Sequence, residues 1–213
     1  MTDEARGLLA VWMTPAPEND ADLNAWYSEE HLKERLAVPG FLSARRYVSI
    51  DGEPKYAALY YLTDAGVLHT EAYTSVLGNS TPWTRRIIDN LQAMIRNEYE
   101  LVHARGVEPA TPASYAYMVR IECDLEHDEE FRDWYGRDHL QAACSVGGVH
   151  TAKLYRATAG EPRYLAVYEL DAPDIPGSPA WRAGTQSEWT ERMRPLFKNR
   201  SNTLGRLIAS VTK

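Results

Sequence analysis

The sequence predicts an α+β protein built from two tandem units that share one order of strands and helices. Shifting the sequence along itself by 108 residues aligns Asn24–Leu62 with Arg132–Leu170 without a gap, and 15 of the 39 aligned positions are identical. At an offset of 106, Trp83-Thr84 recurs as Trp189-Thr190. Such self-similarity indicates a duplication. The expected units are residues 1–108 and 109–213, each the size of a small domain.

Each unit begins with an apolar run that is typical of a strand, Leu8–Met13 in the first and Ala116–Ile121 in the second. The segment Asp22–Leu36 follows, with apolar or aromatic residues every three or four positions. This spacing predicts an amphipathic helix, and Pro39-Gly40 predicts its end.

The next segments, Phe41–Ile50 and Lys55–Leu62, predict a hairpin that turns at Asp51–Pro54. After a less regular stretch over residues 65–78, Pro82–Met94 predicts a second helix, and Glu98–His103 a last strand that Arg206–Val211 matches. The order β-α-β-β-α-β, with both helices on one face of an antiparallel sheet, is the ferredoxin-like arrangement. Each sheet then has a face without helices, and the packing of these two faces predicts a closed layer of sheet within one chain.

Composition excludes several classes of protein. The chain has 213 residues, of which 44% are hydrophobic and 25% charged, as in an ordinary globular protein. A formal charge of −7 argues against nucleic-acid binding. No apolar run is long enough for a membrane span, and the polar start has no secretory pattern, so a cytoplasmic protein is expected. Cys123 and Cys144 are not in a C-x-x-C motif, and two buried free thiols are expected.

The first candidate site is a duplicated aromatic motif on the first helix of each unit. Tyr27 and His31 recur as Tyr135 and His139, and a spacing of four places each pair on one helical face. An imidazole has a pKa suited to moving protons near neutral pH. The neighbouring acids Glu30 and Asp138 are expected to point away from that face. The alternative is that these rings only pack under the sheet.

Further residues are candidates for binding a substrate. Trp26 and Trp134 precede the motif, and Tyr60 and Tyr168 on the strands supply either aromatic walls or core packing. Arg45, matched by Lys153, holds an acidic or phenolate oxygen or is a solvated charge. Trp83 and Trp189, with Arg86 and Arg192 three residues later, close one side of a pocket or pack on the sheet. Arg46 is matched by Leu154, which predicts that one pocket is open and the other more filled.

These motifs resemble a known family. The run Trp-Tyr-x-x-x-His-Leu, the segment Val38–Tyr47, Pro54-Lys55-Tyr56 and Tyr60 are similar to the EthD-like branch of the dimeric α+β barrel superfamily. The resemblance implies a pseudo-dimer within one chain and a pocket between each sheet and its helices. It also implies small-molecule chemistry without a cofactor: oxygenation of aromatic polyketides, cyclisation, lactone isomerisation, dehydration or decarboxylation. Some branches of the superfamily bind haem instead.

The expected function is therefore cofactor-independent proton transfer on a small aromatic or carbonyl-bearing metabolite. His31 or His139 acts as the acid or base, and Tyr27 or Tyr135 orients it or stabilises an enolate. The alternatives are a non-catalytic small-molecule binding protein, a structural paralogue whose pockets are filled, and a haem-binding relative. The sequence has no phosphate-binding loop and no cluster of metal ligands at recognised spacing, so no cofactor and no metal are expected. Further homodimerisation is left open.

Overall fold

The computed structural model describes residues 5–50 and 52–213, so the start of the chain and Asp51 of the expected turn lie outside the described residues. The main elements of the first half are β1 Gly7–Pro15, α1 Asp20–Trp26, a π-helical turn Tyr27–His31, α2 Leu32–Ala37, β2 Phe41–Ser49, β3 Tyr56–Leu62, a 3₁₀ segment Ala65–His69, α3 Glu71–Gly78, α4 Pro82–Asp89 and β4 Leu91–Gly106.

The second half has the same order of strands and main helices. Its elements are β5 Tyr115–Glu122, α5 Asp128–Trp134, a π-helical turn Tyr135–His139, α6 Leu140–Cys144, β6 Val149–Ala159, β7 Tyr164–Leu170, α7 Pro179–Gly184, α8 Glu188–Met193, a 3₁₀ segment Arg194–Leu196 and β8 Lys198–Thr212.

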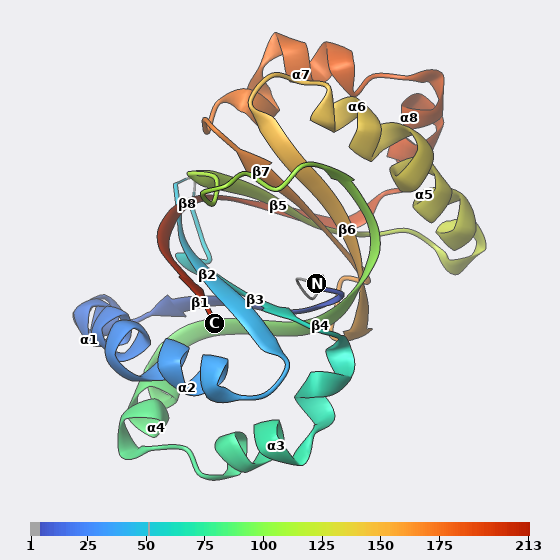
Figure 1. Ribbon diagram of the computed structural model, residues 1–213. Helices are drawn as coiled ribbons and strands as arrows, with labels where there is room; N and C mark the ends of the chain where they lie inside the picture. The colour runs from blue at the N-terminus through green and yellow to red at the C-terminus, as the bar shows by residue number, and fades with distance from the viewer. Residues whose placement is uncertain (1–4, 51) are drawn as a thin grey trace.

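Within the described residues, eight strands close into one antiparallel barrel in the order β1-β3-β2-β8-β5-β7-β6-β4. Helices α1–α4 cover one side of the barrel and α5–α8 cover the opposite side (Figure 1). The predicted α+β fold with two facing sheets is confirmed. The two halves are joined along two seams of backbone hydrogen bonds, between β2 and β8 and between β4 and β6.

The last strand of each half is much longer than the sequence predicted. The helix expected over Pro82–Met94 ends at Asp89, and that prediction was wrong because Leu91 already belongs to β4. β4 pairs with β1 along its first part, where Met94 lies opposite Met13, and with β6 along its last part. Most of the added residues, 91–97, pair with β1 of the same half, and the last ones pair with β6 of the other half; local periodicity reports neither partner. The irregular stretch over 65–78 also differs from expectation, since α3 occupies its end.

Three apolar clusters fill the molecule. Two lie between the sheets and their helices, one in each half, and the third fills the barrel interior, where Trp12, Tyr47 and Tyr155 are fully buried. Both cysteines are free thiols, but only Cys123 is fully buried. Among the described residues, none of the helices has the length and apolar character required to cross a membrane.

Candidate active site

The Tyr-His motif of each half lies in a π-helical turn, not in the regular α-helix that was expected. Because a π-helix bonds residue i to i+5, its wider turn brings together residues five apart. Trp26 stacks on His31 with ring centroids 4.0 Å apart, and Trp134 stacks on His139 at 4.6 Å. The tyrosine of each motif meets the same imidazole edge to face, at 5.2 Å in both halves. The local backbone thus fixes each imidazole between two aromatic rings.

The second half contains a cavity of about 120 Å³ between its sheet and its helices. Four of the predicted site residues line it together: Trp134, Tyr135, His139 and Tyr168. The His139 Nε2 atom lies 3.0 Å from the Tyr168 hydroxyl, which is hydrogen-bonding distance. A cavity of this size has room for a molecule about as large as benzene or for the reacting end of a longer one.

Burial and positive charge shape the chemistry of this cavity. Desolvation, assisted by the positive charges of Arg200 and Arg194 at the cavity wall, lowers the pKa of His139 to about 4. The imidazole is therefore neutral near pH 7. Burial raises the pKa of both Tyr135 and Tyr168, so both hydroxyls keep their protons. The site combines neutral hydrogen-bonding groups with two cations, which favours an oxyanion.

The matching region of the first half is occupied by two arginine side chains. The Arg46 guanidinium lies 3.6 Å from the centre of the Tyr27 ring and donates to Asn24 at 3.1 Å. Arg35 is also buried, and its guanidinium lies 5.4 Å from the centre of the Tyr73 ring. The residues matched to them at the 108-residue offset are Leu154 and Ala143, which are shorter and uncharged. His31 is consequently packed in, and desolvation lowers its pKa well below the usual value.

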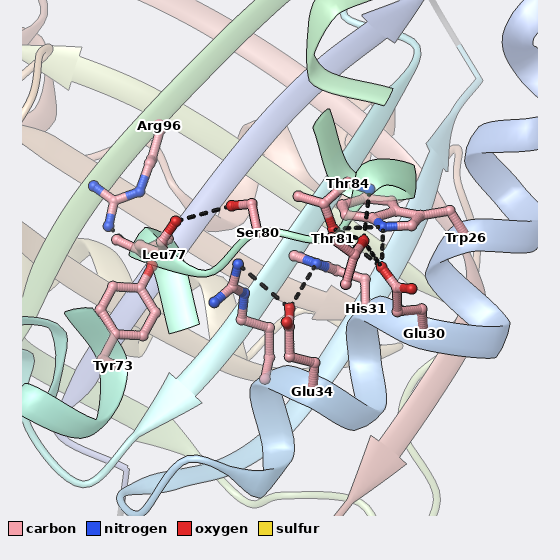
Figure 2. Close-up of polar contacts among 11 residues, drawn as sticks. Trp26, Glu30, His31, Glu34, Tyr73, Leu77, Ser80, Thr81, Thr84 and Arg96 are labelled. Atoms are coloured by element: carbon pink, nitrogen blue, oxygen red, sulfur yellow. Dashed lines mark hydrogen bonds and ion pairs between the residues drawn. The ribbon is translucent and has the colours of Figure 1, made fainter. Parts of the chain in front are cut away.

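The acids beside the histidines hold neighbouring helices together. Figure 2 shows Glu30 at the centre of a hydrogen-bond network: its Oε1 accepts from Thr81 at 2.7 Å, and from Thr84 at 3.1 Å and Trp26 at 3.2 Å. In the second half, Asp138 accepts from Ser187 at 2.5 Å. Thr81 and Ser187 are the N-caps of α4 and α8. These acids therefore point away from the imidazoles, as expected, and fasten the second helix of each half to the first.

Three predicted binding residues lie apart from the histidines. Trp83 donates to Asp22 at 3.0 Å and Trp189 donates to Glu130 at 3.1 Å, so both join neighbouring helices. The expected Trp-Arg contact exists in the first half, where the Arg86 guanidinium is 5.8 Å from the centre of the Trp83 ring. Arg45 faces the barrel interior, on the other side of β2 from Arg46. Tyr60, by contrast, lies beside His31 in the first half, with 6.1 Å between the ring centroids.

The sequence interpretation missed several residues of the cavity wall, chiefly Tyr117, Trp181, Arg194 and Arg200. Trp181 had one available signal, because it stands 108 residues after Tyr73, another buried aromatic residue. No signal in the sequence marked Arg194 and Arg200 as site residues. They lie beside the start of β8, in a region where the two halves share little sequence.

The residues around His139 do not fit a haem group, which some branches of the resembling superfamily bind. The cavity of about 120 Å³ is smaller than the usual range of about 300 to 1,000 Å³ for small-molecule sites, and haem requires a large one. His139 Nε2 already faces the Tyr168 hydroxyl, and its Nδ1 is buried. Among the described residues, no group of three or more His, Cys, Asp or Glu side chains is placed to hold a metal ion.

Comparison with solved structures identifies the class of fold. The chain is similar over its full length to an anthrone oxidase-like protein, with a TM-score of 0.70, 13% identity and 95% of that chain covered. It is also similar to a protein provisionally described as a monooxygenase from Fusobacterium nucleatum, with a TM-score of 0.66, 10% identity, and coverage of 98% of this chain and 95% of that one. A mutant chlorite dismutase from Candidatus Nitrospira defluvii gives a TM-score of 0.62 at 14% identity, covering 97% and 93%.

These neighbours are proteins of the dimeric α+β barrel superfamily, and this chain has that fold. At such identities the similarity shows the fold alone. No protein-family model and no curated protein matches the sequence. The EthD-like branch indicated by the sequence motifs therefore stays a prediction.

Proposed function

We propose that this chain is a cofactor-independent enzyme that moves a proton on a small phenolic or carbonyl-bearing metabolite, in the cavity beside His139. The observation that carries the proposal is the convergence of a neutral imidazole, two tyrosine hydroxyls and two arginines on one cavity. The name of the anthrone oxidase-like neighbour favours an aromatic substrate.

The depressed pKa of His139 restricts the substrate. A group with a pKa of about 4 takes a proton from a phenol of pKa about 10 against a cost of about 8 kcal/mol, at about 1.4 kcal/mol per unit. Arg194 and Arg200 offset part of this cost because they stabilise the anion that forms. The site consequently favours substrates whose proton is already acidic, such as a C–H between a carbonyl and an aromatic ring, and it disfavours unactivated C–H groups.

In the proposed step, the substrate O–H or C–H bond breaks, and the proton goes to His139 Nε2, directly or through the Tyr168 hydroxyl. The electron pair stays on the substrate as a phenolate or enolate, held near Arg200. Trp134 and Trp181 supply the apolar walls that exclude water. Return of the proton to another position gives isomerisation, and other fates of the anion give cyclisation, dehydration, decarboxylation or reaction with dioxygen.

The test begins with thermal stabilisation by anthrones, phenolic acids and lactones, followed by product analysis with and without dioxygen. His139→Ala is expected to lower turnover by about 10²- to 10⁴-fold while the protein stays folded. The matched His31→Ala is expected to keep turnover but to lower the free energy of unfolding by about 1–3 kcal/mol.

A rival function is a carrier or sensor that binds a metabolite in the same cavity without converting it. Tight binding of a hit with no product under either atmosphere favours this rival. If neither histidine variant changes turnover or affinity, the Tyr-His motif serves packing alone and the proposed site is wrong.

A further inference from the structure

A second and larger cavity opens at one end of the barrel. Its volume is about 850 Å³, within the usual range for small-molecule sites, and it shares no lining residue with the His139 cavity. The His139 cavity lies between the sheet and the helices, whereas this one is lined by inward-facing residues of the barrel, among them Arg45 on β2 and Lys153 on β6. The proposed function does not use it.

Two of the cations that line this cavity converge on one carboxylate. Arg45 and Lys153 are matched at the 108-residue offset, and each reaches Glu108, which follows β4 in the connection between the halves. Arg45 Nη2 lies 3.6 Å from Glu108, and Lys153 Nζ forms a close ion pair with it. Both cations also lie over the Tyr61 ring, at 5.1 and 5.7 Å from its centre. Glu108 is the exposed partner, with 49% of its side chain accessible against 14% and 18% for the cations.

The charges around Glu108 determine the charge of a ligand that could replace its carboxylate. Arg45 also pairs with Glu169, which is 1% exposed, so Arg45, Lys153, Glu108 and Glu169 together are neutral. If Glu108 swings out into solvent, one positive charge is left in a partly desolvated site, and a single carboxylate restores neutrality. Arg105 and Lys213 also line the opening, with their charged ends bound to backbone carbonyls.

An unpartnered buried polar atom also lies at this cavity. Thr151, a lining residue of β6, is 2% exposed, and its Oγ1 has no hydrogen-bond partner. Buried hydroxyls are nearly always bonded to protein, water or ligand, so this atom is a further anchor for a bound molecule. Leu42, Leu101 and Tyr61 add apolar surface beside the charged groups.

We propose that this opening of the barrel is a second ligand site, which binds an organic carboxylate with an apolar body. The ligand carboxylate lies between Arg45 and Lys153 in place of the Glu108 carboxylate, and its body contacts Tyr61 and Leu101. Glu108 is then an internal competitor that occupies the site when no ligand is present.

The experiment is calorimetric titration of the full chain with 2-naphthoate and with 2-naphthamide, an uncharged molecule of nearly the same shape. Naphthoate is expected to bind at least about tenfold more tightly, because only it replaces the lost negative charge. Glu108→Gln is expected to tighten naphthoate binding by about three- to tenfold, since the competing carboxylate is removed. Lys153→Met is expected to weaken it by about tenfold or more.

Three control variants distinguish this site from naphthoate binding elsewhere on the protein. Glu126→Gln and Lys33→Met change exposed charges outside the barrel opening and are expected to leave affinity unaltered. Arg200→Gln alters the His139 cavity and is also expected to have no effect, so failure of the proposed function does not remove this site. Equal affinity for acid and amide, no tightening in Glu108→Gln, or loss of naphthoate binding in Arg200→Gln each overturns the proposal. Circular dichroism confirms the fold of each variant, and Glu108→Gln decides the matter if Lys153→Met does not fold.

Discussion

The protonation state of His139 makes the stability of the protein depend on pH. His139 has a pKa of about 4 in the folded protein, against about 6.5 for an unperturbed histidine. Between these two values the unfolded chain binds a proton that the folded chain does not, so stability rises with pH across this window. The contribution of His139 is complete above pH 6.5 and is lost as the pH falls toward 4. His31, whose pKa is lowered by burial among Arg35 and Arg46, acts in the same direction.

We therefore predict that His139→Gln makes the free energy of unfolding less dependent on pH. From pH 7 down to pH 4, the wild-type protein should lose up to about 3 kcal/mol more than the variant. Urea unfolding at intervals across this range measures both curves. The difference between them removes the contribution of carboxylates such as Glu169, whose pKa burial raises. Parallel curves would mean that His139 titrates normally and that the cavity does not desolvate it.

The π-helical turns are the elements that place both histidines, and the second one rests on the other half of the chain. Gly136 lies in this turn, and a Cβ added to it meets the ring of His103 on β4 at 2.7–2.8 Å. Ser28 stands at the matching position in the first half. The missing side chain at residue 136 thus lets the turn approach a strand that belongs to the first half.

The substitution Gly136→Ala has two effects of opposite sign on the free energy of unfolding. The added methyl group overlaps the imidazole and is expected to cost about 1–3 kcal/mol, whereas alanine in a helix is favoured over glycine by up to about 1 kcal/mol. We predict a net loss of stability in the wild-type background. In a His103→Ala background the overlap disappears, and the same substitution should stabilise the protein by about 0.4–1 kcal/mol. Chemical unfolding of the four proteins tests this; the same sign in both backgrounds contradicts the contact.

At the scale of the whole molecule, a buried ion pair crosses the barrel interior between the halves. Arg45 on β2 pairs with Glu169 on β7, and both side chains are largely buried. Removing one partner of such a pair typically costs about 3–5 kcal/mol, because the other charge stays buried without compensation. Replacing both partners with apolar residues is often nearly neutral.

We predict that Arg45→Met lowers the free energy of unfolding by about 3–5 kcal/mol, and that Arg45→Met combined with Glu169→Leu recovers most of this loss. Because the pair joins strands of different halves that also share two hydrogen-bonded seams, the wild-type chain should unfold in one transition. Tryptophan fluorescence and far-UV circular dichroism, followed in the same urea titration, measure both effects. Two separate transitions, or a double variant as unstable as the single one, would show that the halves are not coupled in this way.

Local pattern predicted the α+β class and most of its strands and helices. Apolar runs located β1 and β5, the predicted hairpin corresponds to β2 and β3, and the spacing of Leu23, Trp26 and Leu32 located the first helix. The strand signals survive because β1 and β3 are buried along nearly their whole length, which requires apolar residues whatever their partners are. Trp134, Tyr135 and His139 of the repeated motif, together with the separately predicted strand residue Tyr168, line one cavity. The tandem duplication itself, with a boundary at residue 108, stays a prediction.

Only the tertiary structure decided which half has the cavity and what surrounds it. The Arg46 guanidinium lies over the Tyr27 ring, whereas the matched residue Leu154 is uncharged, and the sequence difference alone did not say which pocket would be open. Arg194 in the 3₁₀ segment before β8 and Arg200 on β8 both line the cavity, and β4 and β8 each pair with one strand of their own half and one of the other half. The physical reason is the same in each case: residue periodicity reports which face of an element is buried, but partners distant in sequence determine what that face meets.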